Sequence, residues 1–120
     1  MKENIIKEKS LKFAIRVVKL YNYLKEEKSE FVMSKQLLRS GTAIGAQIYE
    51  AEHAESKADF IHKLSIAQKE TNESLYWMEL LSRTKYISTG EYNSINTEAI
   101  EIIKILSKII ITTRKNLEEN

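Results

Sequence analysis

Cysteine and proline are absent from this 120-residue chain, and glycine occurs only three times. Without cysteine, the chain has no disulfide scaffold and no thiolate that binds a metal or attacks a substrate, and it suits a reducing compartment. Proline and glycine are the residues that most often punctuate strand-rich folds, so their scarcity favours long helices.

Long apolar runs are also missing. No uninterrupted apolar stretch reaches the roughly 20 residues that a membrane-spanning helix needs, and Ser107 and Lys108 interrupt the isoleucine-rich C-terminal region. Lys12, Arg16 and Lys19 break the N-terminal apolar stretch in the same way, so no signal peptide is expected. We therefore expect a cytoplasmic protein that does not contact a membrane.

The remaining composition is that of an ordinary globular domain. Hydrophobic residues make up 42% of the chain and charged residues 30%, which separates it from disordered proteins. The length suits one domain with its own core. We expect a single domain over residues 1–120.

Four segments of helical periodicity predict helices at about residues 10–27, 34–53, 57–84 and 91–117. Ser10 and Ser56 are candidate N-caps for the first and third helices. The connections are short, which favours antiparallel neighbours and predicts an all-α, up-down-up-down four-helix bundle. A strand in the C-terminal region is the main alternative, but Glu101, Lys104 and Lys108 keep a helical rather than an alternating spacing.

The apolar stripes predict which face of each helix is buried. In the first helix, the expected core stripe is Leu11, Ala14, Ile15, Val18 and Tyr21, widened by Phe13, Val17, Leu20 and Leu24. The other stripes are Leu37, Gly41, Ile44, Ile48 and Ala51; Phe60, Leu64, Ala67, Thr71, Ser74, Met78 and Leu81; and Ile95, Ala99, Ile102, Ile103, Leu106, Ile110, Thr113 and Leu117.

The second helix carries a further stripe opposite its core face, formed by Arg39, Ala43, Ala46, Glu50 and His53. Small residues within a helix let another backbone approach closely. Two interpretations are open, packing by neighbouring helices of the same bundle or contact with another subunit. Apolar residues that lie outside the core stripes favour self-association; they are Ile66, Tyr76, Leu80, Ile100 and Ile111.

Positive charge is concentrated near the N-terminus. Residues 1–28 contain eight lysines and arginines against four glutamates, whereas the whole chain has a net charge of only +2. Lys9, Lys12, Arg16 and Lys19 recur at spacings of three and four residues and form one row along the first helix. Such a row is suited to neutralising nucleic-acid phosphates. The alternative is a solvated helix face without a partner.

Two Glu/Asp-x-x-His pairs resemble the ligand spacing of carboxylate-bridged metals in helical bundles. Glu50 precedes His53, and Asp59 precedes His62. Both pairs fall at the hairpin end between the second and third helices, and the first and fourth helices offer no inward carboxylate. We therefore expect no metal, no cofactor and no catalytic residue, and two histidines that face solvent.

A cluster of charged residues is also expected between the second and third helices. Arg39 and Glu50 lie on the second helix, and Glu70 and Glu73 lie on the third. Charges paired inside a bundle more often fix the register of packing than perform acid–base chemistry.

The central hairpin resembles a known family. Residues 36–51 (QLLRSGTAIGAQIYEA), residues 60–67 (FIHKLSIA) and Glu73 are similar to the four-helix bundle proteins encoded in intervening sequences of 23S ribosomal RNA genes. Arg39 and Glu50 also match the family pattern. At positions 47, 49 and 51 this chain has Gln, Tyr and Ala, where the family usually has Asn, Ala and Gly.

The resemblance implies an antiparallel four-helix bundle and no enzymatic activity. Relatives, including the accessory protein of diversity-generating retroelements, form pentameric rings with a positively charged surface. Our leading hypothesis is therefore a homo-oligomer, expected to be a pentamer, that binds RNA, DNA or a ribonucleoprotein through the Lys9/Lys12/Arg16/Lys19 row. The alternative is a protein–protein interaction scaffold that does not bind nucleic acid.

Overall fold

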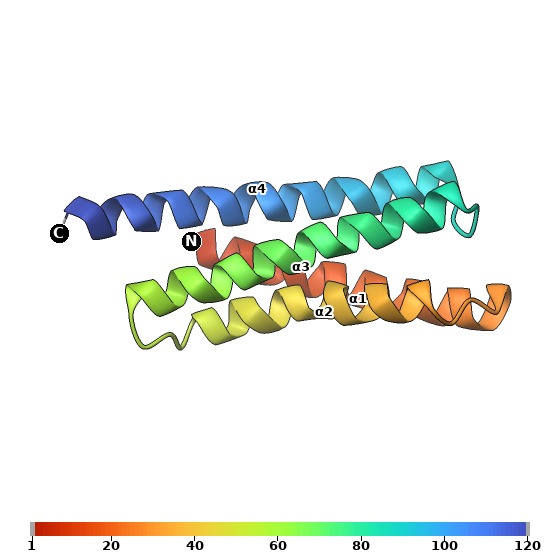
Figure 1. Ribbon diagram of the computed structural model, residues 1–120, viewed down its shortest axis with the longest axis horizontal. Coiled ribbons are helices and arrows are strands. Elements are labelled where there is room, and N and C mark those ends of the chain that lie inside the picture. Colours follow the sequence, from red (N-terminus) through yellow and green to blue (C-terminus); the bar gives the residue numbers. More distant parts are fainter. Residues whose placement is uncertain (1, 120) are drawn as a thin grey trace.

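The computed structural model describes residues 2–119 of the chain, with side chains described for residues 5–118. Its helices are α1 (Lys2–Lys28), α2 (Met33–Ala51), α3 (Lys57–Arg83) and α4 (Thr89–Glu119), and no strand occurs in this part of the chain. Figure 1 shows an elongated bundle, which measures 53 × 22 × 20 Å. The helical C-terminal region confirms the prediction of an all-α fold.

Each helix contacts two neighbours. α1 packs on α2, α2 on α3, α3 on α4, and α4 returns to α1, while the diagonal pairs do not meet within residues 2–119. This arrangement is the predicted up-down-up-down bundle. The α1–α4 seam is the sparsest of the four contacts. None of the helices in the described range carries an apolar stretch long enough to cross a bilayer.

Ser56 caps α3 as predicted, because its hydroxyl oxygen accepts a hydrogen bond of 3.0 Å from the backbone N–H of Asp59. The predicted cap at Ser10 is wrong. Ser10 lies inside α1, fully buried, and its hydroxyl donates to the carbonyl of Lys7 at 2.9 Å. The helix begins earlier because Ile6, one turn before Ser10, is also part of the core.

The start of α2 depends on a buried carboxylate. Glu30 accepts hydrogen bonds from the backbone N–H groups of Val32, Met33 and Ser34, at 3.0, 3.0 and 2.7 Å. Burial favours the neutral form of Glu30, but these backbone hydrogen bonds outweigh it, so its pKa is lowered. Glu30 thus supplies the acceptors that the first N–H groups of a helix need.

The core faces predicted for α2, α3 and the first two thirds of α4 are confirmed, except that Phe60 and Ile103 are only half-buried. Buried residues recur at the expected positions, including Ile44 on α2, Met78 on α3 and Ile102 on α4. Leu117 is exposed instead, because the last turns of α4 extend beyond the other helices (Figure 1).

The predicted core stripe of α1 is wrong at three of its five positions, and its other two residues, Ala14 and Tyr21, are only half-buried. Leu11, Ile15 and Val18 are between 40% and 48% exposed. The residues that were expected only to widen that stripe form the core face: Phe13, Val17, Leu20 and Leu24. Both stripes repeat every three or four residues, so periodicity alone does not separate them.

Candidate nucleic-acid interface

Two of the four residues of the predicted basic row form ion pairs with α4. The Lys9 ammonium lies 2.8 Å from the Glu101 carboxylate. Arg16 pairs with Glu98 and lies 3.3 Å from Glu91. Burial opposes the charge of Arg16, but its hydrogen bonds and attraction to Glu98 and Glu91 outweigh this effect and raise the pKa of the guanidinium. These pairs close the sparse α1–α4 seam.

The other two residues of the row differ from each other. Lys12 lies 3.9 Å from the Glu8 carboxylate, one turn earlier on α1, and both side chains are exposed. Lys19 has no carboxylate within ion-pair distance among the described residues. Lys9, Lys12 and Arg16 therefore each lie close to a glutamate, and Lys19 is the residue of the row without a nearby negative charge in the part of the chain that the structure describes.

Lys19 opens onto a groove of about 1060 Å³ at the end of the bundle where α1 stops and α3 turns into α4. We call this feature the basic groove. Its charged residues are the five cations Arg16, Lys19, Lys28, Arg83 and Lys85 and the single carboxylate Glu91, and its aromatic residues are Tyr23 and Tyr86.

The turn after α3 places Lys85 and Tyr86 in the basic groove. The backbone N–H of Tyr86 donates to the carbonyl of Leu81 at 2.9 Å, and that of Lys85 donates to Ser82 at 3.0 Å. This pair of hydrogen bonds is the Schellman motif, which ends a helix with one residue in the left-handed conformation. Lys85 is that residue, with φ of 68°. The motif therefore fixes the backbone of Lys85 and Tyr86 at the end of α3.

Not every cation of the basic groove is available to a ligand. Arg83 lies 3.0 Å from Glu79 within α3, and Arg16 is held by the α4 carboxylates. Lys19, Lys28 and Lys85 have no ion-pair partner among residues 5–118. Three lysines without a counter-ion thus border one recess.

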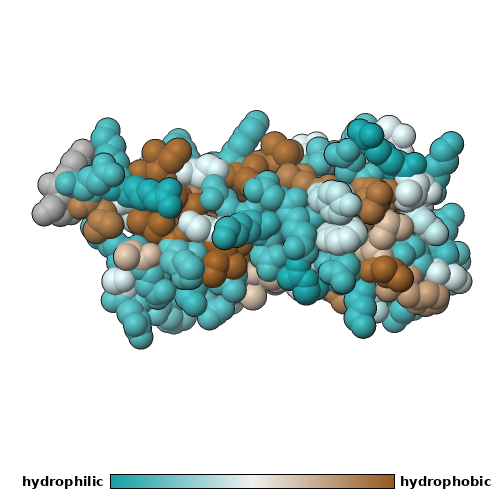
Figure 2. All heavy atoms as spheres, viewed as in Figure 1, coloured by the Kyte–Doolittle hydropathy of each residue, from teal (hydrophilic) through white to brown (hydrophobic). Residues whose placement is uncertain are grey.

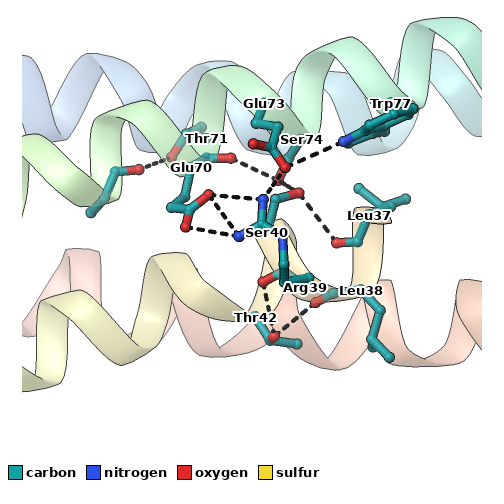
Figure 3. A network of polar contacts seen from close by, with 11 residues as sticks. Leu37, Leu38, Arg39, Ser40, Thr42, Glu70, Thr71, Glu73, Ser74 and Trp77 are labelled. Carbon is teal, nitrogen blue, oxygen red and sulfur yellow. Dashed lines mark hydrogen bonds and ion pairs between the residues drawn. The ribbon is translucent and has the colours of Figure 1, made fainter. Parts of the chain in front are cut away.

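The charged cluster predicted between α2 and α3 is present in part. Arg39 on α2 pairs with Glu70 at 3.2 Å and with Glu73, and Glu73 also accepts a hydrogen bond of 3.3 Å from the indole N–H of Trp77 (Figure 3). The hydrogen bonds from Arg39 to Glu70 and Glu73 raise the pKa of its guanidinium. Half of the Arg39 side chain is exposed, so the cluster lies at the rim of the helix contact.

The other residues of the second stripe predicted on α2, opposite its core face, lie outside this charged cluster. Glu50 pairs with Lys63 at 3.7 Å, nearer the end of the bundle that lies opposite the basic groove. Ala43 is half-buried and Ala46 is exposed. Deeper in the contact between α2 and α3, Ser40 and Ser74 are buried, and their hydroxyl oxygens lie 2.8 Å apart.

Of the apolar residues expected outside the core, Tyr76 and Ile111 are exposed, while Ile66, Leu80 and Ile100 are half-buried. Figure 2, viewed from the same side as Figure 1, shows brown apolar patches that interrupt the polar surface of the bundle. Leu11, Ile15 and Val18 of α1 are exposed as well. Apolar surface therefore remains on several helices.

Residues of both Glu/Asp-x-x-His pairs, Glu50, His53 and Asp59, line one recess at the α2–α3 end of the bundle. Asp59 accepts a hydrogen bond of 3.2 Å from the backbone N–H of Glu55, and His53 and His62 are exposed as predicted. Within the described residues, no group of three His, Asp or Glu side chains has the geometry of a metal site.

Comparison with known proteins is consistent with this architecture. A family model described as 23S rRNA-intervening sequence protein matches residues 2–108. The crystal structure of a protein with unknown function from the S23 ribosomal protein family of Bacteroides thetaiotaomicron is similar, with a TM-score of 0.91 and 61% sequence identity; the match covers 92% of this chain and 98% of that chain. No match is found among curated proteins.

Proposed function

The chain belongs to the 23S rRNA-intervening sequence protein family, and on that premise we propose that it is a non-enzymatic homo-oligomer that binds nucleic acid or a ribonucleoprotein through the basic groove. The lack of cysteine supports a reducing compartment such as the cytoplasm as its place of action.

The observation that carries the proposal is the set of three unpaired lysines, Lys19, Lys28 and Lys85, around one recess. A lysine that neutralises a phosphate releases condensed counter-ions, which supplies the sequence-independent part of nucleic-acid affinity. A lysine already paired with a carboxylate gains less, because the phosphate must compete with that carboxylate. This difference moves the expected phosphate contacts away from Lys9, Lys12 and Arg16 and towards the basic groove.

Charge reversal tests the proposal. In filter binding to a mixed-sequence RNA at low salt, we expect the triple variant Lys19→Glu, Lys28→Glu and Lys85→Glu to lose about 100-fold or more in affinity. The matched control substitutes three exposed lysines outside the groove, Lys69→Glu, Lys104→Glu and Lys108→Glu, and changes the net charge equally. Equal losses in the two triple variants contradict a localised site.

Self-association is the second part of the proposal. It is supported by the exposed apolar residues of α1, Leu11, Ile15 and Val18, and by the pentameric rings that the family resemblance implies. In a ring, the basic groove is repeated in every subunit, and its field is multiplied. Light scattering coupled to size exclusion is expected to give the mass of a pentamer, and a monomer at micromolar concentration contradicts this part.

A protein–protein interaction scaffold is the second candidate, and the same exposed apolar residues favour it. A scaffold of this kind co-purifies with one stoichiometric protein and is not retained on nucleic acid at low salt. Retention on nucleic acid that depends on Lys19, Lys28 and Lys85 contradicts the scaffold as the sole function.

A further inference from the structure

The basic groove combines cations with two tyrosine rings that make no ring-stacking or cation–π contact within the part of the chain that the structure describes. Tyr23 is 44% exposed and Tyr86 is half-buried, and both line the recess. Four other aromatic rings are engaged: Tyr76 stacks edge-on with Trp77, and Tyr49 and Tyr21 each lie under a lysine. Within the described residues, Tyr23 and Tyr86 make no such ring contact.

Shape decides which nucleic acid suits this recess. A double helix carries its phosphates on a convex surface and keeps its bases stacked inside, so it presents no base to a ring within a concave site. A single strand has bases that are free to leave the stack and lie on aromatic side chains, while cations follow its backbone. The volume of about 1060 Å³ lies just above the range of roughly 300–1,000 Å³ for sites that enclose small organic ligands.

We propose that the basic groove binds a single-stranded segment of nucleic acid, with unstacked bases lying on Tyr23 and Tyr86 and the flanking phosphates on Lys19, Lys28 and Lys85. This inference rests on the proposed function and narrows it to one class of ligand. The Schellman turn fixes the backbone conformation of Lys85 and Tyr86, so one phosphate and the neighbouring base contact consecutive residues.

The test compares four fluorescent probes of about 12 nucleotides, a length within the range that single-strand sites cover. They are oligouridylate, oligothymidylate, a blunt duplex of the same length, and an oligothymidylate whose central residues are abasic. In fluorescence anisotropy, we expect both single strands to bind at least tenfold more tightly than the duplex. The abasic strand keeps every phosphate, so its weaker binding reports the contacts made by the bases.

Side-chain variants locate the stacking. Tyr23→Leu and Tyr86→Leu are each expected to weaken oligothymidylate binding by about tenfold, whereas Tyr23→Phe and Tyr86→Phe keep the ring and the affinity. The control is Tyr49→Leu, because Tyr49 is 45% exposed but lies outside the groove. Tyr86 also packs against the core, so Tyr23→Leu and the abasic strand decide the outcome if Tyr86→Leu unfolds.

Three results overturn the single-strand inference. They are equal affinity for duplex and single strand, full affinity for the abasic strand, and unchanged affinity of Tyr23→Leu. Each of these leaves nucleic-acid binding itself intact. Absence of binding to all four probes removes the inference and the proposed function together.

Discussion

Gly41 of α2 lies so close to Val17 of α1 that a β-carbon at position 41 would stand 2.9 Å from both methyl carbons of the valine. Val17 is fully buried and branched at its β-carbon, so its methyl groups have little freedom to move. This contact brings the backbone of α2 against α1 and fixes which face of α1 is buried.

Gly41→Ala is therefore expected to lower the free energy of unfolding by about 1–3 kcal/mol, because overpacking outweighs the gain in helix propensity. Gly45→Ala is the control, since its β-carbon would meet Ser10 at an ordinary 3.5 Å, and it is expected to be neutral or stabilising by up to about 1 kcal/mol. Chemical denaturation measures both. In a Val17→Ala background the cost of Gly41→Ala should shrink, and an unchanged cost argues against the contact.

This contact also explains where the sequence misleads. Leu11, Ile15 and Val18 repeat at helical spacing as regularly as Phe13 and Val17 do, because α1 is apolar on most of its circumference. The α2 face that carries Gly41 packs against Val17 and so selects one of the two stripes. This contact between helices cannot be read from the periodicity of α1. The apolar stripes predicted for α2, α3 and α4 coincide with most of their buried residues, so those faces follow from the sequence.

The basic groove was missed for a different reason. Its lysines come from α1 and from the turn after α3, which are far apart in the chain. The bundle topology does bring the end of α1 and the α3–α4 turn together, so Lys28, Lys85 and Tyr86 carried a usable signal. The neutralisation of Lys9 and Arg16 by α4 carboxylates depends on the relative rotation of two helices, which periodicity does not give.

Glu30 should make stability depend on pH. Its pKa is lowered in the folded chain, so the unfolded chain binds more protons as the pH falls. The stabilisation is present above the unfolded pKa of about 4.3 and is lost as the pH falls through the lower folded pKa. Denaturant titrations of wild type and Glu30→Gln should differ by about 1–2 kcal/mol at neutral pH and converge in acid. A constant difference across this pH range contradicts the role of the carboxylate.

Arg39 should contribute little to stability despite its two carboxylate partners. Half of its side chain is exposed, and ion pairs at the surface contribute about 0–1 kcal/mol. Arg39→Ala is therefore expected to change the free energy of unfolding by less than about 1 kcal/mol, with a smaller change in high salt. A loss several times larger would mean that the cluster is buried by something outside this chain, such as a second subunit.

Lys85→Gly separates folding from binding. Glycine adopts the left-handed conformation of position 85 without the steric cost of a β-carbon, so the variant is expected to gain about 0.5–1 kcal/mol in stability. It also loses one cation of the basic groove and should bind nucleic acid more weakly. Ser29→Gly is the matched control, because Ser29 has φ of 53° but lies outside the groove; it should gain stability with unchanged binding. Weaker binding by both variants contradicts the assignment of Lys85.

The salt dependence of oligonucleotide binding tests the central claim most directly. For a single strand, the slope of log affinity against log salt is about −0.7 for each phosphate neutralised, so three lysines predict a slope of about −2. Replacing Lys19, Lys28 and Lys85 together by glutamine should bring that slope close to zero, whereas glutamine at Lys69, Lys104 and Lys108 should leave it unchanged. The same slope in both triple variants would contradict nucleic-acid binding through the basic groove.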